Sequence, residues 1–254
     1  MLKRTIQFIC AGYLLFLWGC ATYNPATGRS ELIFISTQEE VTMGENFHQQ
    51  LMQEYKLSTN KNNVERVQRV GQKLAQVSDR QDFAYKFFIV DKDELNAFTT
   101  PGGNVYIFSG LLNTITTDDQ LAFVLGHEVG HSAAKHTVKK FQAALGADLI
   151  TNIILSQVGE GAQRVANISS SLLTNIIFSA YGRQDEFEAD RLGVKYMYLA
   201  GYDTKGSMEA LAALKKESEG LSIPLLRTHP YLDDRIKAVE KEVEGVKQKY
   251  GQPL

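Results

Sequence analysis

The chain has 254 residues and a formal net charge of −2, with both signs of charge scattered along its length. That length allows one sizeable domain or two small ones, and a hydrophobic fraction of 44% is ordinary for a globular protein. A nucleic-acid-binding protein would normally carry a basic stripe. This sequence has none, so nucleic acid is not an expected partner.

The N-terminus has the pattern of a secretory signal. Lys3 and Arg4 precede an apolar run over 6–18, about 13 residues long, which is short for a bilayer span but typical of a signal peptide. The run ends in the letters LWGC, which resemble a bacterial lipoprotein cleavage box, although tryptophan is unusual at its second position. The resemblance implies a signal peptide over 1–19 and a lipid on Cys20. A plain signal or a short membrane anchor is the alternative.

Cleavage at this point would leave Cys20 as the only cysteine, since Cys10 lies within the signal. The mature protein could then form no internal disulfide, even in an oxidising compartment. Cys20 is followed by Ala21 rather than aspartate, which by the same resemblance favours the outer membrane of a two-membrane bacterium. We therefore expect a cell-envelope protein, lipid-anchored at the periplasmic face of the outer membrane, with 20–36 as its lipidated N-terminus and extended tether.

Capping boxes and apolar periodicities then predict a helix-rich domain. The letters STQE at 36–39 form a capping box that predicts a helix to about residue 55. Aromatic and β-branched residues predict strands over 83–90 and 104–109. A second capping box, TDDQ at 117–120, opens a helix that continues to about residue 136. The other helices are expected over 62–77, twice within 141–180, and over 184–200, 204–218 and 232–249.

The helix after the second capping box contains His127-Glu128-Val129-Gly130-His131, which matches H-E-x-x-H. Residues four apart lie on one helix face, so both imidazoles can reach one ion, and Glu128 can address a water on that ion. Zn²⁺ suits such ligands, and a catalytic zinc site has three protein ligands and one position for water. Gly126 and Gly130 are expected to make room for a substrate backbone. Two histidines on an ordinary helix are the alternative.

A second motif, Glu186-Phe187-Glu188-Ala189-Asp190, can supply the third ligand. Glu186 and Asp190 are again four residues apart, so one carboxylate can bind zinc while the other accepts a hydrogen bond from a ligand histidine. Glu188 points about 200° away from Glu186 and is expected in solvent or in a salt bridge. A charged helix face that pairs locally with Arg191 is the alternative.

The letters HEVGH and EFEAD, with PGGNVYIFSGLL upstream and RTHPYLDDR downstream, resemble the HtpX-like and CAAX-prenyl-protease-like gluzincin metallopeptidases. The likeness covers roughly 24–240 and is to their soluble bacterial lipoprotein branch, the BepA and LoiP type, without its helical-repeat domain. The resemblance implies a helix-rich α+β metallopeptidase domain over 37–254 with a small sheet and the H-E-x-x-H motif on its active-site helix. It also implies one zinc ion, with Glu128 as the catalytic residue, Asp190 supporting a ligand histidine, and three protein ligands, His127, His131 and Glu186.

The same resemblance places His229 near the metal. There it could stabilise the oxyanion or occupy the open coordination position, and a histidine in a turn before Pro230 is the alternative. Arg235 could support that site or merely begin the last helix. His48 and His136 match no motif and are expected at the surface.

The predicted activity is metal-assisted hydrolysis of peptide bonds, in which Glu128 takes a proton from water and delivers it to the leaving amine. We expect 104–109 to be an edge strand on which an extended substrate lies against Asn104, Val105 and Tyr106, with broad sequence tolerance. An interior strand is the alternative. The expected substrates are unfolded or misassembled envelope proteins, which is a quality-control role. A chaperone or assembly lipoprotein with a latent or weak protease site is the alternative function.

Overall fold

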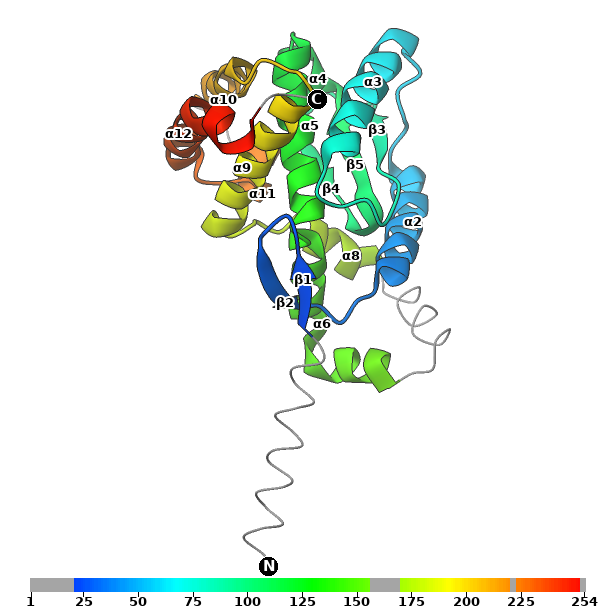
Figure 1. Cartoon of the computed structure of the whole chain (residues 1–254). Helices are drawn as coiled ribbons and strands as arrows, with labels where there is room; N and C mark the ends of the chain where they lie inside the picture. Colours follow the sequence, from blue (N-terminus) through cyan, green and yellow to red (C-terminus); the bar gives the residue numbers. More distant parts are fainter. Residues whose placement is uncertain (1–20, 156–169, 220–222, 252–254) are drawn as a thin grey trace, which may run out of the picture.

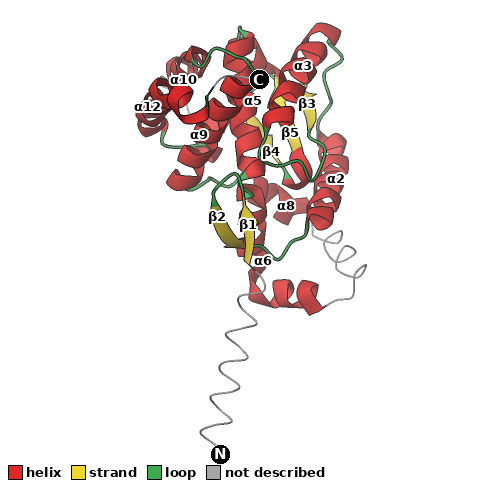
Figure 2. Cartoon of the chain, viewed as in Figure 1, coloured by secondary structure: helices red, strands yellow, loops and turns green. Residues whose placement is uncertain are grey.

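The structure is a computed structural model that describes residues 21–155, 170–219 and 223–251. The predicted signal peptide, 1–19, and the predicted lipidation site Cys20 lie outside the described residues. The described part is a helix-rich α+β fold, as predicted, in which a small sheet lies between helices (Figure 1, Figure 2).

The sheet has three strands, and β5 (Asn104–Phe108) is the central one. Strand β3 (Lys86–Val90) runs parallel to β5 on one side, and β4 (Ala97–Thr99) runs antiparallel to it on the other. Two of the strands were predicted, but the three-residue β4 is too short to give a sequence pattern. The sheet is therefore mixed, and its edges are β3 and β4.

The prediction that 104–109 forms an edge strand on which substrate lies is wrong. Asn104, Val105 and Tyr106 are almost inaccessible to solvent, because neighbouring strands pair with β5 on both sides. Successive side chains of a strand point to opposite faces, so Val105 packs into one hydrophobic core and Tyr106 into the other. These residues hold the sheet between its helices and offer no unpaired backbone edge to a substrate.

One face of the sheet is covered by α3 (Lys61–Val77) and α5 (Asp118–Ala133), which share a core with β3 and β5. The predicted apolar stripe of α3 faces this core. Helix α5 begins with the predicted capping box, in which the Thr117 hydroxyl accepts a hydrogen bond from the backbone of Gln120. The helix that carries H-E-x-x-H is thus fixed along the sheet.

The other face is covered by α2 (Thr37–Glu54), α6 (His136–Leu155) and α8 (Ser170–Ile177). Helix α2 begins with the other predicted capping box, formed by Ser36 and Glu39. The sheet lies between these helices and the pair α3 and α5 (Figure 1).

The predicted continuation of α5 to about residue 136 is wrong, because the helix ends at Ala133. Lys135 then adopts a positive φ of 57°, and α6 begins at His136. The Lys135 ammonium lies 3.2 Å from the Glu40 carboxylate, and Arg80 also pairs with Glu40 at 2.7 Å. This buried cluster holds the break between the two helices in place.

Beyond α5, on the side away from the sheet, three predicted helices form a second group (Figure 1). Helix α9 (Arg183–Leu199) makes the most extensive contact with α5, and α12 (Leu232–Tyr250) packs on α9. Within the described residues, no helix is both long and apolar enough to cross a bilayer. The elements of this group are α9 (Arg183–Leu199), α10 (Lys205–Glu217) and α12 (Leu232–Tyr250), and the short connecting elements are η1 (Pro101–Gly103), α4 (Ser109–Thr114) and α11 (Pro224–Thr228).

The segment expected to be an extended tether instead forms a β-hairpin. Strands β1 (Ala21–Asn24) and β2 (Arg29–Leu32) pair antiparallel, and the predicted turns join them. The hairpin is fixed to the body: the Arg191 guanidinium donates to the backbone oxygen of buried Ala26 at 3.0 Å, and the Lys139 ammonium donates to the Glu31 carboxylate at 2.6 Å. The tether prediction is therefore wrong for these residues, because polar groups of α6 and α9 hold them.

Candidate metal centre

Helices α5 and α9 approach closely because glycines lie at their crossing. A Cβ added to Gly130 would lie 2.9 Å from the backbone oxygen of Ala189, and one added to Gly193 would lie 3.0 Å from the backbone nitrogen of His127. The prediction that Gly126 and Gly130 make room for a substrate backbone is therefore wrong, since they make room for α9. This close approach brings α9 side chains to the H-E-x-x-H motif.

Replacing Gly130 with alanine should destabilise the fold by about 1–3 kcal/mol, because the new methyl group must displace the α9 backbone. Gly245→Ala in α12 is the matched control. A Cβ there meets nothing within 4 Å, so alanine should stabilise the helix by about 0.5–1 kcal/mol. Thermal unfolding of the two variants checks both the predicted loss of stability in Gly130→Ala and the predicted gain in Gly245→Ala. An unchanged melting temperature in Gly130→Ala would contradict the tight crossing.

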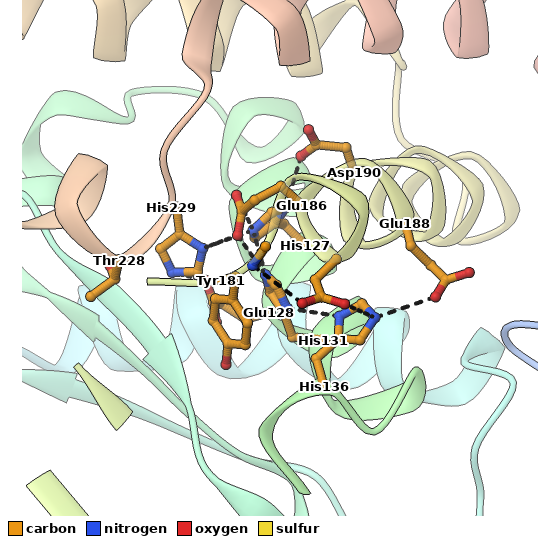
Figure 3. A network of polar contacts seen from close by, with 12 residues as sticks. His127, Glu128, His131, His136, Tyr181, Glu186, Glu188, Asp190, Thr228 and His229 are labelled. Atoms are coloured by element: carbon orange, nitrogen blue, oxygen red, sulfur yellow. Dashed lines mark hydrogen bonds and ion pairs between the residues drawn. The ribbon is translucent and has the colours of Figure 1, made fainter. Parts of the chain in front are cut away.

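Four side chains from three segments converge between α5 and α9: His127, His131, Glu186 and His229 (Figure 3). Each offers one donor atom, and these atoms all lie within 4.8 Å of one another. All four residues are buried, and the most exposed of them, His127, is only 4% accessible. The histidine near Pro230 is thus at the cluster, as the resemblance implied.

The separations between these donor atoms fit one tetrahedral metal ion. His131 Nε2 lies 3.0 Å from His127 Nε2, and His229 Nδ1 lies 3.2 Å from His127 Nε2. Glu186 Oε1 lies 3.1 Å from His229 Nδ1 and 3.3 Å from His131 Nε2. A tetrahedral ion with bonds of about 2.0–2.1 Å places its ligands about 3.3 Å apart. Three imidazoles and one carboxylate are also a donor set suited to such an ion.

Asp190 and Arg235 fix the orientation of the His127 ring. His127 Nδ1 lies 2.8 Å from Asp190 Oδ1, which leaves Nε2 directed at the other donor atoms. Arg235 donates to both oxygens of Asp190, from Nε at 2.8 Å and from Nη2 at 2.7 Å. Such a bidentate pair restrains the carboxylate, which in turn sets the tautomer of the histidine. Arg235 therefore supports the site as well as lying in the first turn of α12.

The same guanidinium balances the charge of Glu186. Arg235 Nη1 lies 2.8 Å from Glu186 Oε2. Burial alone would raise the pKa of Glu186, but His229 and Arg235 hold it well below its usual range. Burial would likewise raise the pKa of Asp190, which Arg235 and His127 lower instead. Both groups are therefore carboxylates, the forms that can bind a cation or accept from a histidine.

Glu128 lies on the His229 side of the cluster and is 1% exposed. Its Oε1 is 3.5 Å from His229 Nε2, and its Oε2 has no hydrogen-bond partner among the described residues. Burial raises the pKa of Glu128. A buried carboxyl group with a free oxygen, next to the cluster, is placed to accept and return a proton.

A protein-family model described as "Peptidase family M48" matches residues 61–243. The chain belongs to peptidase family M48. That match contains α5, α9 and the turn at His229, so the whole metal cluster of this M48 chain lies inside it.

Relatives of this M48 chain carry protease names. Metalloendopeptidase OMA1 of Bos taurus is 27% identical over 90% of this chain and 47% of its own length. Mitochondrial metalloendopeptidase OMA1 of Schizosaccharomyces pombe is 26% identical over 92% of this chain and 69% of its own length. The Beta-barrel assembly-enhancing protease of Escherichia coli K12 is 26% identical over 84% of this chain and 45% of its own length. The M48 chain thus spans about half the length of the bovine and E. coli relatives.

Two residues next to the cluster of this M48 chain escaped prediction. His136 is 2% exposed, and its Nδ1 lies 3.0 Å from His131 Nδ1, so its expected place at the surface is wrong. The Tyr181 ring stacks on the His131 ring with 3.8 Å between centroids, and its hydroxyl lies 3.1 Å from the Thr137 hydroxyl. Neither has a motif of its own, and the spacing of five residues after His131 would not place His136 on the same face of a continuous helix.

Two further predictions concern single side chains outside the cluster. Glu188 forms a salt bridge with Arg29 at 2.7 Å, which was one of its two predicted settings. His48 is half-buried rather than at the surface. Its Nδ1 lies 3.0 Å from the Tyr106 hydroxyl, and its ring packs on Phe88.

Proposed function

We propose that this M48 chain is a zinc-dependent endopeptidase in which His127, His131 and Glu186 bind the ion. The observation that carries the proposal is the convergence of buried imidazole and carboxylate donors at tetrahedral spacing, with the Glu128 carboxyl beside them. A structural zinc site would not need an additional carboxyl group beside its four donors. The metalloendopeptidase names of the relatives support the same activity.

Different residues of this chain would carry out different steps of peptide hydrolysis. Zinc, when bound, supplies a Lewis acid that polarises a carbonyl and acidifies water. Glu128 accepts a proton at its free oxygen and later returns it to the leaving amine, and its raised pKa suits both steps. Asp190 and Arg235 keep the His127 ring in the orientation that leaves Nε2 free for the ion.

The described conformation is a closed one, which supports a latent protease. His229 takes the fourth position of the donor set, where water or substrate would bind in an active zinc site. The turn that carries His229 is anchored to the segment before α9, because the Tyr181 backbone donates to the Thr228 oxygen at 3.0 Å. The Lys140 ammonium holds that segment by donating to the Ser179 oxygen at 2.6 Å. Turnover would require His229 to move away, which keeps a chaperone or assembly role with weak proteolysis as the second candidate.

Strand β4 is the better candidate for the edge that receives an extended substrate, because it lies at the edge of the sheet. Ala97, Phe98 and Thr99 are as buried as the residues of β5 in the described conformation, so a substrate could pair with β4 only after a local opening. The Phe108 amide donates to the Asn96 oxygen and the Thr100 amide to the Asn104 oxygen, both at 3.0 Å. In this antiparallel register, the backbone groups of Ala97 and Thr99 point away from β5. Within the described residues, no strand pairs with that side of β4. A groove lined by Asn96, Phe178 and Thr228, among other residues, runs beside it.

We further propose that the substrates are unfolded or misassembled polypeptides of the cell envelope. Main-chain pairing with a sheet edge favours extended chains of any sequence over folded ones. The name of the E. coli relative links that protein to β-barrel assembly. A lipid on Cys20 would hold the enzyme at the periplasmic face of the outer membrane, beside such substrates.

Purified protein should contain one zinc ion per chain and should degrade unfolded casein. Incubation with a chelator should remove both the metal and the activity, and added zinc should restore them. Elemental analysis and a fluorescent casein assay measure the two quantities on the same sample. Casein cleavage that survives complete metal removal would overturn the proposal. A zinc-loaded chain that suppresses casein aggregation without cleaving it would favour the chaperone role instead.

A further inference from the structure

The two ligand histidines of the H-E-x-x-H motif have different outer partners. His127 Nδ1 meets the Asp190 carboxylate directly. His131 Nδ1 instead meets another imidazole, that of His136, at 3.0 Å. His136 Nε2 in turn lies 3.3 Å from Glu188 Oε2. A carboxylate therefore stands behind each ligand ring, but behind His131 it acts through an intermediate histidine (Figure 3).

The chemistry of imidazole gives this chain of contacts a direction. When His131 Nε2 faces the ion, its proton is on Nδ1, which therefore donates to His136. His136 Nδ1 must then be the acceptor, so its own proton is on Nε2 and points at Glu188. Each hydrogen bond fixes the tautomer of the next ring. The acceptor at the end is a carboxylate that lies 2.7 Å from the Arg29 guanidinium and 3.7 Å from that of Arg191.

Glu188 is also the point where the N-terminal hairpin meets this chain of contacts. Arg29 of β2 donates to Glu188 Oε2 at 2.7 Å, the same oxygen that faces His136. Arg191 lies 3.7 Å from the other oxygen and also donates to the Ala26 backbone within the hairpin turn. The hairpin and the metal cluster thus share one carboxylate.

We propose that His136 is a positioning residue for His131, and that Glu188 and Arg29 extend its support to the N-terminal hairpin. This inference rests on the proposed metal site. If His136, Glu188 and Arg29 support His131 in this way, the affinity for zinc depends on a hairpin that begins at residue 21, directly after the predicted lipidation site. Asp185 Oδ1 also lies near His136 Nε2, at 3.5 Å, but it forms no hydrogen bond with that nitrogen, whereas Glu188 Oε2 does so at 3.3 Å. The other Asp185 oxygen accepts from the Gly182 backbone and caps α9. Glu188 is therefore the partner assigned to His136.

Zinc affinity, measured by competition with a chromogenic chelator, tests the role of His136. His136→Leu removes the acceptor and should weaken zinc binding by about 10–100-fold. His136→Asn places an amide oxygen near the position of Nδ1 and should restore most of the affinity. His48→Asn is the matched control, because His48 contacts Tyr106 rather than the cluster. Equal zinc affinities in wild type and His136→Leu would overturn the proposal.

A double-mutant cycle separates a specific chain of hydrogen bonds from general destabilisation. Glu188→Ala should weaken zinc binding by about tenfold in the wild-type background. In the His136→Asn background it should change little, because asparagine cannot pass support from Glu188 to His131. The same loss in both backgrounds would mean that Glu188 acts independently of His136 and would overturn the inference.

Arg29→Gln tests the link to the hairpin and should weaken zinc binding by about two- to fivefold, as expected for a partly exposed charge. Arg69→Gln is its control: Arg69 makes an equally short bond of 2.7 Å to Asp118 at the first residue of α5, away from the cluster, and its loss should leave zinc affinity unchanged. Equal effects of the two substitutions would contradict the link. Failure of the wild-type chain to bind zinc would refute the proposed function itself, whereas wild-type binding with unaffected variants would refute only this inference.

Discussion

Replacing Glu128 with glutamine is expected to abolish peptide hydrolysis while the protein keeps its metal. Glutamine has the shape of glutamate, so the packing of this 1%-exposed side chain is preserved. The amide cannot take a proton from water, and loss of a general base typically costs about 10²–10⁴-fold in rate. We therefore expect turnover of a quenched fluorescent peptide to fall by at least about a hundredfold. Zinc content per chain, measured on the same preparation, should be unchanged.

Glu45→Gln provides the matched control for this experiment, because Glu45 is an exposed carboxylate that pairs only loosely with Lys86, at 3.7 Å. Its turnover should equal that of the wild type. Wild-type turnover in a cleanly purified Glu128→Gln protein would remove Glu128 from the mechanism. Loss of zinc in that variant would show that Glu128 serves to hold the ion rather than to move protons.

Arg235→Leu should be the most destabilising substitution in the protein prepared without metal. It removes the only cation that contacts both Asp190 and Glu186 among the described residues and leaves two buried carboxylates close together. Breaking a buried ion pair from one side typically costs about 3–5 kcal/mol. For a chain of this size that corresponds to a fall in Tm on the order of 10 °C, measurable by calorimetry.

Added zinc should recover part of this loss, because a second cation beside Glu186 replaces some of the missing positive charge. The control is Arg183→Leu, which breaks a surface pair with Asp234 between the same two helices, α9 and α12. Exposed pairs contribute about 0–1 kcal/mol, so its Tm should hardly change. Similar losses in the two variants would show that the burial of Arg235 has no energetic importance.

The parts of the fold that were predictable are those encoded by neighbouring residues. The capping boxes at Ser36 and Thr117 predicted the starts of α2 and α5, because each needs only a side chain and a backbone amide three residues away. The metal cluster was predictable for a related reason. Each of its two motifs places two side chains on one helix face, and zinc chemistry then requires the two helices to meet.

The errors concern features that depend on tertiary structure. Strand β5 was taken for an edge strand because the order of strands depends on β4, which is only three residues long. His136 was expected at the surface because nothing in the sequence marks the end of α5. Lys135 adopts a positive φ there, which turns His136 inward, but the position does not carry the glycine that usually signals such a backbone conformation. The docking of the hairpin depends on Arg29 reaching Glu188, far along the chain.

The four donor residues come from three separate segments of the chain, which affects how the protein can acquire its ion. Helix α5 carries two donors, α9 carries one, and the turn after α11 carries the last, so the complete set exists only when distant parts of the chain have assembled. With every donor shielded from solvent, an ion enters or leaves only when these parts separate. We therefore expect the metal to load at the last stage of folding and to exchange slowly with free ions in the folded protein.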